Sequence, residues 1–297
     1  MNIIGREIDQ EKVDYIVSKV KEKQELSGID NSIVLEEFKK ELSKNSKLTD
    51  SFLSGKLFAQ KTIVKLVRNT LRRMHGTFNV DIKKRNELIN LYIEQRRKKY
   101  IVDLLKTHKS SEERIGIYES LYHNIFEITK QPSSILDLGC GLNPLSSIFF
   151  ESSEINYLAF DISVDDLKLI DTFFKSNDNI TGETKIINLF DAKSKNIFSK
   201  MGHFDICFLF KLLDSIELSK SHKLSEIIIK GVPADWLIVS FATKTVSGKK
   251  MNYPGRGWFE RMLGRLNYFH RKLVYDNEVF YIVKKLEESK KLTDDYN

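Results

Sequence analysis

The sequence predicts an α/β protein, in which an all-α segment precedes a mainly parallel sheet of seven strands covered by helices. From residue 134 onward, short apolar runs alternate with helical patterns, which is typical of a parallel sheet. Before that point, apolar residues recur at helical spacing. We therefore expect a helical domain over residues 1–106, an α/β domain over residues 107–287 and a flexible charged tail over residues 288–297.

The composition is that of an ordinary globular protein. Of the 297 residues, 41% are hydrophobic and 30% are charged, and the chain is long enough to bury two cores. Its apolar runs fall far short of the ~20 residues that cross a bilayer. Two cysteines, Cys140 and Cys207, offer neither a disulfide framework nor a metal cluster. We expect a cytoplasmic monomer that uses no metal and no membrane.

The positive charge is concentrated in one segment. Residues 56–106 carry 14 Lys and Arg against 4 Asp and Glu, whereas residues 1–55 carry 9 against 11 and residues 107–297 carry 25 against 26. A cationic segment beside a nearly neutral α/β domain indicates a polyanionic partner rather than a small acceptor.

Two predicted helices carry these cations. Lys61, Lys65, Arg68 and Arg72 fall on one face of a helix, and no acidic residue lies four positions away to neutralise them. A different face is expected to pack inward with Ile63, Val64, Val67, Leu71 and Met74. The alternatives are a solvated surface and an anionic membrane. We expect RNA contacts from Lys61, Lys65, Arg68, Arg72, Arg73, Lys83, Lys84, Arg85, Arg96 and Arg97.

The segment after these helices connects them to the sheet. Ser110 and Glu113 form a capping box, which predicts one continuous helix from Ser110 through Ile125.

The most informative stretch is Leu136-Asp137-Leu138-Gly139-Cys140-Gly141, where an apolar strand ends in a glycine turn. Glycines let a backbone turn sharply and approach a ligand closely, although many such turns are purely structural. Pro144 stands where a dinucleotide fold has its third glycine, so the NAD pattern is broken. A second strand over residues 155–161 ends in Asp161, a carboxylate at the distance expected for gripping ribose hydroxyls. The combination resembles motifs I and II of Rossmann-like class I methyltransferases that use S-adenosylmethionine (SAM).

The remaining pattern completes such a sheet. A helix is predicted over residues 164–175 and further strands over residues 184–190, 203–210 and 236–241, with helices near 220–230 and 258–266. Two closing strands, 272–276 and 278–284, predict a terminal hairpin.

Four motifs in fixed order identify a narrower resemblance. They are Thr107-His108-x-Ser110-x-x-x-Arg114, the Leu-Gly-Cys-Gly-Leu-Asn-Pro string ending at Pro144, Val239-Ser240-Phe241-x-Thr243, and Asn277-Glu278-x-x-Tyr281. Together they resemble the aminoglycoside-resistance 16S rRNA (guanine 1405-N7) methyltransferases of the Arm/Rmt type. The likeness covers roughly residues 100–285, and the basic N-terminus resembles that family's rRNA-binding extension.

This resemblance implies methyl transfer from SAM to N7 of a guanine in the decoding region of small-subunit rRNA, within the 30S subunit. It also implies that Arg114 reaches the SAM carboxylate, that Asp161 holds the ribose and that Lys211 lies near the methyl group. The residues expected to bind the cofactor are His108, Arg114, Asp137, Gly139, Gly141, Asp161, Ile162, Asp191, Ala192 and Lys211. For His108, a structural hydrogen bond in the linker is an alternative.

The predicted chemistry needs no acid or base. N7 of guanine carries an in-plane lone pair and no proton, so aligning it with the methyl group is the main task. A helical base must be flipped out, and Trp236, Tyr253, Trp258, Phe259 and Tyr268 are aromatics available for stacking, although each taken singly suits the core better. A basic loop containing Lys244, Lys249 and Lys250 is expected to contact the RNA, with an ordinary surface loop as the alternative. Methylation of tRNA or a small molecule, and a non-catalytic role in ribosome assembly, are the competing hypotheses.

Overall fold

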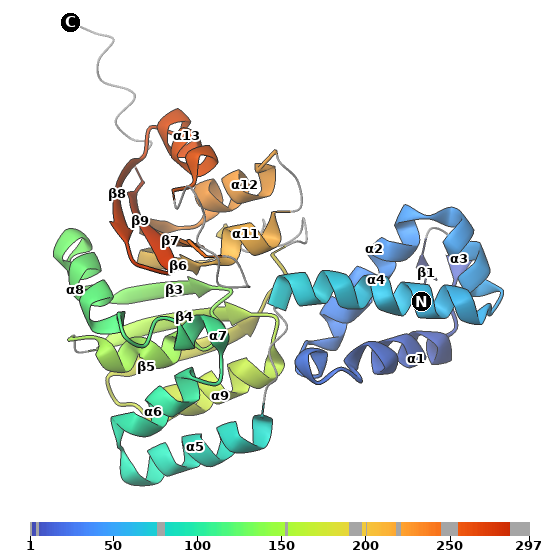
Figure 1. Cartoon of the computed structure of the whole chain (residues 1–297), viewed down its shortest axis with the longest axis horizontal. Coiled ribbons are helices and arrows are strands. Elements are labelled where there is room, and N and C mark those ends of the chain that lie inside the picture. Colours follow the sequence, from blue (N-terminus) through green and yellow to red (C-terminus); the bar gives the residue numbers. More distant parts are fainter. Residues whose placement is uncertain are drawn as a thin grey trace, which may run out of the picture.

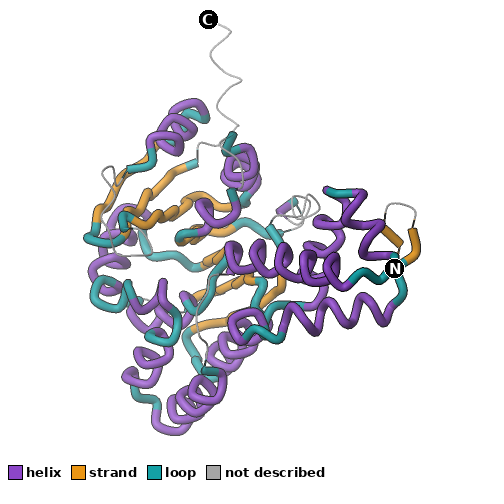
Figure 2. Tube along the Cα trace, turned by 45° about the vertical axis from the view of Figure 1, so that its right-hand side comes forward, coloured by secondary structure: helices purple, strands orange, loops and turns teal. Residues whose placement is uncertain are grey.

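The computed structural model describes residues 2–3, 6–75, 81–151, 154–189, 198–199, 201–217, 221–244 and 255–285. It contains a helical bundle and a seven-stranded sheet, which lie side by side in Figures 1 and 2. The expected fold class, an α/β methyltransferase sheet with a helical N-terminal region, is confirmed. None of the described helices combines the length and the apolar character that a membrane crossing needs.

The N-terminal bundle, residues 6–75, has its own core. It consists of α1 (Gln10–Lys21), α2 (Asn31–Lys44), α3 (Ser46–Leu53) and α4 (Leu57–His75), with a short 3-10 helix, η1 (Gln24–Leu26). Asp9, Asp30 and Asn45 cap the first three helices through their side chains. Apolar residues at helical spacing, among them Phe38 and Val67, form a separate buried cluster. A two-stranded ribbon, β1 (Asn2–Ile3) and β2 (Arg6–Glu7), precedes the bundle.

The sheet has the strand order β5-β4-β3-β6-β7-β9-β8. Its five parallel strands are β3 (Ser134–Leu138), β4 (Ile155–Asp161), β5 (Ile180–Ile186), β6 (Phe204–Phe210) and β7 (Ala234–Ala242). The strands β8 (Phe269–Val274) and β9 (Glu278–Lys284) form the expected hairpin, and β9 is antiparallel to β7. The strand expected over residues 184–190 begins and ends four residues earlier, as β5.

Helices cover both faces of the sheet. One face carries α5 (Ile82–Gln95), α6 (Lys98–Leu105), α8 (Tyr118–Thr129), α9 (Val164–Lys175) and the 3-10 helix η2 (Asn143–Phe149), and the other carries α11 (Leu212–Ile216), α12 (Lys223–Gly231) and α13 (Gly257–Arg265). Successive residues of β3 alternate between the two cores: Ile135 faces the first and Leu136 the second.

Helices α5 and α6 pack with the sheet rather than with the bundle. Ile89, Ile101 and Leu104 share one core with the strand residue Ile135. Residue 106, where we expected a domain boundary, therefore lies inside one packed unit. The two helices are basic on their exposed side, but their apolar side packs towards α9 and the sheet.

The continuous helix expected from Ser110 is replaced by two helices. A single turn, α7 (Lys109–Glu112), is followed by a non-helical stretch to Ile117, and α8 begins at Tyr118. Neither helix start has a side-chain cap, so the capping box is wrong. The break is explained by tertiary contacts: Glu113 and Arg114 turn towards the sheet and bond there with Lys211 and Glu278.

Candidate functional site

The glycine turn after β3 is shaped so that side chains cannot fit. Gly139 and Gly141 have φ angles of +65° and +49°, a region that favours glycine. A Cβ on Gly139 would lie 2.7 Å from Cδ1 of Leu212, and one on Gly141 would lie 2.9 Å from Nε2 of His108. The turn thus leaves bare backbone at the carboxyl end of the sheet.

A cavity of about 360 Å³ opens beside this turn. Its walls come from the ends of β3, β4 and β6, from α11, and from the turn around α7. Seven of the predicted cofactor-binding residues line it: His108, Arg114, Gly139, Gly141, Asp161, Ile162 and Lys211. This volume lies within the range of small-molecule sites.

Asp161 is held at the cavity by backbone groups. Its Oδ2 accepts a hydrogen bond from Gly141 N at 2.8 Å, and its Oδ1 accepts from Ile162 N at 2.7 Å and Ser163 N at 3.0 Å. The side chain of Ser163 in turn caps α9 by accepting from Asp166 N. An ionised carboxylate only accepts hydrogen bonds, so this side chain suits donors such as the hydroxyl groups of ribose.

Asp137, predicted to bind the cofactor, lies behind the turn and is not among the residues that line the cavity. Its Oδ2 accepts hydrogen bonds from Tyr157 OH at 2.7 Å and Asn143 Nδ2 at 2.9 Å, while its Oδ1 has no partner among the described residues. Burial raises the pKa of Asp137 to about 6, against the opposing effect of these hydrogen bonds. The residue therefore supports the turn from beneath.

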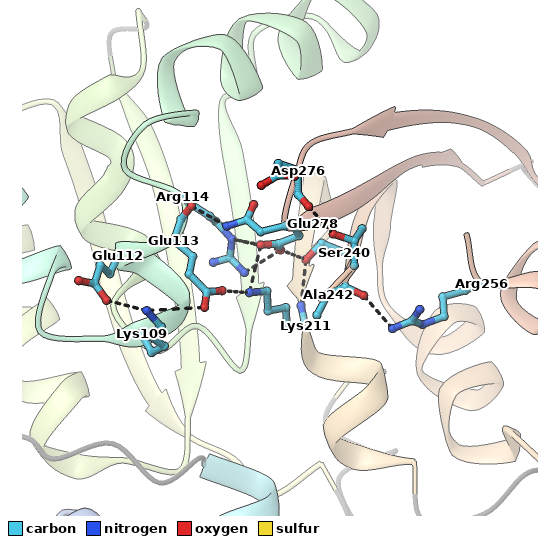
Figure 3. Close-up of polar contacts among 12 residues, drawn as sticks. Lys109, Glu112, Glu113, Arg114, Lys211, Ser240, Ala242, Arg256, Asp276 and Glu278 are labelled. Carbon is cyan, nitrogen blue, oxygen red and sulfur yellow. Dashed lines mark hydrogen bonds and ion pairs between the residues drawn. The ribbon is translucent and has the colours of Figure 1, made fainter. Parts of the chain in front are cut away.

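An ion network lies at one end of the cavity (Figure 3). Arg114 Nη2 lies 2.9 Å from Glu278 Oε1, and both residues are almost fully buried. Ser240 Oγ also donates to this carboxylate. Lys211 Nζ lies 2.5 Å from Glu113 Oε2 and 3.4 Å from Glu278 Oε2. Arg114 and Lys211, which line the cavity, thus meet two carboxylates between the ends of β6, β7 and β9.

The backbone fixes the position of Lys211. Its φ of 54° is left-handed, and its N–H donates to Ser240 Oγ at 2.9 Å. This abrupt turn after β6 directs the side chain to Glu113 instead of along the strand. The pKa of Arg114 is lowered by burial but raised more by Glu278 and neighbouring tyrosines, so the guanidinium stays charged.

The expected basic face of α4 is partly neutralised by residues distant in sequence. Arg72 donates two hydrogen bonds, of 2.9 and 2.8 Å, to Glu25, and Arg68 binds the Lys19 carbonyl and lies 3.6 Å from Glu22. No acidic residue lies four positions away along the chain, but Glu22, just after α1, and Glu25, in η1, approach this face from elsewhere in the bundle.

Arg85 is not placed to contact RNA. It is 3% exposed, and its Nη1 lies 2.5 Å from Asp166 Oδ1 while its Nε donates to Thr107 Oγ1 at 2.7 Å. The guanidinium fastens α5 to α9 and to the linker. Its assignment to the RNA-binding set is therefore wrong.

The other predicted RNA-binding residues lie mainly on the surface. Arg96 is anchored to the Ser176 carbonyl, and Lys244 pairs with Asp276. The residues of the set that are exposed are Lys61, Lys65, Arg73, Lys83, Lys84, Arg96 and Arg97. Lys249, Lys250, Asp191, Ala192 and Tyr253 lie outside the described residues.

Most of the candidate stacking aromatics are engaged elsewhere. Phe259 is fully buried in the core beneath α13, and Trp258 stacks on His222 with ring centres 3.9 Å apart. Trp236 lies beneath the ammonium group of Lys284.

Burial raises the pKa of both cysteine thiols, Cys140 and Cys207, which suits inert core residues. Among the described residues, no three His, Cys, Asp or Glu side chains gather as a metal site would require.

Sequence reasoning missed several cavity residues. Met74 was expected to pack inward within the helical domain, and Asn188 and Ser215 carried no motif, yet all three line the cavity. The helical period could place Met74 on an inner face but could not show that this face reaches the sheet.

The chain is similar to several known proteins. Residues 95–279 match the family model described as "Ribosomal RNA methyltransferase (FmrO)". A 16S rRNA (guanine(1405)-N(7))-methyltransferase of Proteus mirabilis is 28% identical over 259 residues, which cover 77% of this chain and 86% of that protein.

Two solved structures are similar as well. The 16S rRNA methylase ArmA is 27% identical, with a TM-score of 0.53 over 68% of this chain and 98% of that one. The fold is also that of the 16S rRNA methyltransferase RmtF, crystallised with S-adenosyl-L-homocysteine, at 20% identity and a TM-score of 0.69, over 94% of this chain and all of that one.

Proposed function

Because the chain belongs to the FmrO family of ribosomal RNA methyltransferases, we propose that it methylates N7 of a guanine in the decoding region of 16S rRNA. The observation that carries the proposal is the cavity beside Gly139 and Gly141, which is lined by the carboxylate of Asp161 and by the buried Arg114. The relative from Proteus mirabilis, which covers 77% of this chain, is named for methylation of N7 of a 16S rRNA guanine.

The cavity suits SAM along its whole length. A Cβ at Gly139 or Gly141 would collide with Leu212 or His108, which line the cavity, so the glycines keep the turn close to it. Asp161 would hold the ribose, and Arg114 would meet the carboxylate of the methionine end. When bound, SAM supplies an electrophilic methyl group on a sulfonium. Asp191 and Ala192, beyond the described residues, are proposed to meet the adenine.

The protein's own task is alignment rather than proton transfer. N7 of guanine has no proton to lose, so no general base is assigned. Lys211 is placed at the cavity by its left-handed backbone and held by Glu113, and we assign it to the neighbourhood of the reacting methyl group. Well-oriented reactants gain an effective molarity of roughly 10⁵–10⁸ M, which is enough to explain catalysis by position.

The substrate is proposed to be the assembled 30S subunit, met in the cytoplasm by a monomer. Exposed cations on α4, α5 and the α5–α6 turn, including Lys61, Lys65 and Lys84, offer contacts to several phosphates. A compact small-molecule acceptor would gain nothing from such an extended surface.

The test is a map of modified nucleotides in RNA from cells with and without the protein, by primer extension and mass spectrometry. We expect one added methyl on a decoding-region guanine, and in vitro transfer to 30S subunits but not to naked 16S rRNA. A methyl found on tRNA instead would support the competing acceptor. RNA without any added methyl, together with no SAM binding, would support a non-catalytic assembly factor.

A further inference from the structure

The N-terminal bundle reaches the cofactor cavity along the loop that follows Asp161. Asp30 N donates to the Ile162 carbonyl at 3.1 Å, and Val164 N donates to the Gly28 carbonyl at 2.8 Å. Ile29 and Ser163 form a β-bridge between these two bonds. The side chain of Ile162, a cavity residue, packs against the core of the bundle. The ribose-side wall of the cavity is thus backed by the bundle.

The bundle also contributes directly to the opposite wall. Arg73 and Met74, in the last turns of α4, line the cavity, and α4 packs against α11, which supplies Leu212 and Ser215 to the same cavity. Figure 1 shows this end of α4 directed at the carboxyl ends of the strands.

A third connection comes from α2. Glu36 Oε2 accepts a hydrogen bond of 2.8 Å from Nδ2 of Asn188, a cavity residue that follows β5. Three separate parts of the bundle therefore touch three separate stretches of the cavity wall.

Helix α4, which lines the cavity at one end, also carries exposed cations. Lys61 and Lys65 are exposed on α4, which is 19 residues long and so spans about 28 Å. One continuous helix therefore joins the exposed cations to the cavity.

We propose that α4 belongs to both binding sites. Arg73 and Met74 are further cofactor-binding residues supplied by the N-terminal bundle, and binding of rRNA and of SAM strengthen each other through this helix. The inference rests on the proposed function, because it takes SAM as the occupant of the cavity.

The physical basis is that both ligands contact both bodies. A cofactor in the cavity touches the sheet and α4, and rRNA lying along the cations touches α4, α5 and the α5–α6 turn. Each ligand favours the docked arrangement of the bundle and the sheet. Binding of one ligand therefore lowers the free-energy cost of ordering that arrangement when the other ligand binds. Linkage then requires the two effects on affinity to be equal.

The first experiment measures binding of S-adenosyl-L-homocysteine to the full chain by calorimetry. Met74→Ala removes a partly buried cavity side chain, and we expect about fivefold weaker binding. Leu53→Ala is the matched control, because Leu53 packs against the same bundle core but does not line the cavity. The control is expected to lose comparable thermal stability and to keep the wild-type affinity.

The second experiment measures affinity for purified 30S subunits with and without saturating S-adenosyl-L-homocysteine. We expect the wild type to bind about fivefold more tightly with it, and Met74→Ala to bring this ratio close to one. A wild-type ratio of one, or equal cofactor affinity in the two variants, would overturn the inference alone. A wild type that binds no S-adenosyl-L-homocysteine would instead overturn the proposed function, and this inference with it.

Discussion

Arg114 and Glu278 form a buried ion pair across 164 positions of sequence, with Nε and Nη2 of the arginine within 3.1 Å of the carboxylate. The pair joins the turn ahead of α8 to the first residue of β9. It therefore holds the arginine at the end of the cavity and ties the linker to the closing hairpin.

Glu278→Gln should lower the free energy of unfolding by about 3–5 kcal/mol, because it leaves a buried guanidinium without its counter-charge. Urea denaturation measures this. The matched control is Glu226→Gln, which breaks the more exposed pair with Arg265 and should cost less than about 1 kcal/mol. Equal losses in the two variants would contradict the central role of the Arg114 pair.

Asp161→Ala should abolish binding of S-adenosyl-L-homocysteine in calorimetry while leaving affinity for 30S subunits without cofactor close to that of the wild type. The carboxylate both faces the cavity and accepts from Gly141, Ile162 and Ser163, so its removal disorders the turn as well as the ribose contact. Asp161→Asn keeps the shape and should retain part of the affinity. Loss of 30S binding in both variants would show that cofactor and RNA sites are not separate.

Charge reversal at Lys61 and Lys65 should weaken binding to 30S subunits and flatten its salt dependence by about one log–log unit for each lost phosphate contact. Both residues are exposed and form none of the ion pairs described among neighbouring residues. Arg68, whose guanidinium is already engaged with Lys19 and Glu22, is the less suitable target. The control is Lys230→Glu, at an exposed position of α12, which should leave the salt dependence of 30S binding unchanged. An equal flattening in this control would indicate non-specific electrostatic attraction.

The buried carboxyl of Asp137 predicts a distinct pH dependence. Its pKa is about 6 in the folded protein and near 3.8 when exposed, so the folded state binds the proton more tightly between these values. The contribution of this group to stability is thus greatest below pH 4 and is lost as the pH rises to about 6. The loss is on the order of 2–3 kcal/mol.

Asp137→Asn removes the titration and preserves the size of the side chain. Unfolding by urea at a series of pH values should therefore show a smaller decline between pH 4 and 6 in the variant than in the wild type. Parallel curves would show that the carboxyl titrates normally.

The sheet and the turn could be predicted because their signals are local. Apolar runs that end in Gly139, Asp161 and Lys211 mark strand ends, and parallel strands bring those ends to one edge. The family resemblance depended on short motifs of the same kind. The strand β5 begins four residues earlier than expected, but its order in the chain, between α9 and β6, is as predicted.

The errors concern residues whose partners lie far away in sequence. In the sequence, Arg85 is one more cation in a basic run. Its partner Asp166 lies 81 positions later, so only the fold shows that the two residues meet. Ser110 and Glu113 fit a capping box, but the bonds of Glu113 and Arg114 to the sheet outweigh the local preference. Arg72 likewise finds Glu25 on another element. In each case the deciding contact is tertiary, and helical periodicity carries no information about it.

The β-bridge between Ile29 and Ser163 has a consequence for engineering and for comparison among relatives. An N-terminal bundle grafted from another methyltransferase would have to match the loop after β4 residue for residue. Otherwise the graft would misalign the part of the cavity wall formed by Asp161 and Ile162. We expect the two segments to be exchangeable only together, so a working chimaera would need its junctions drawn around both.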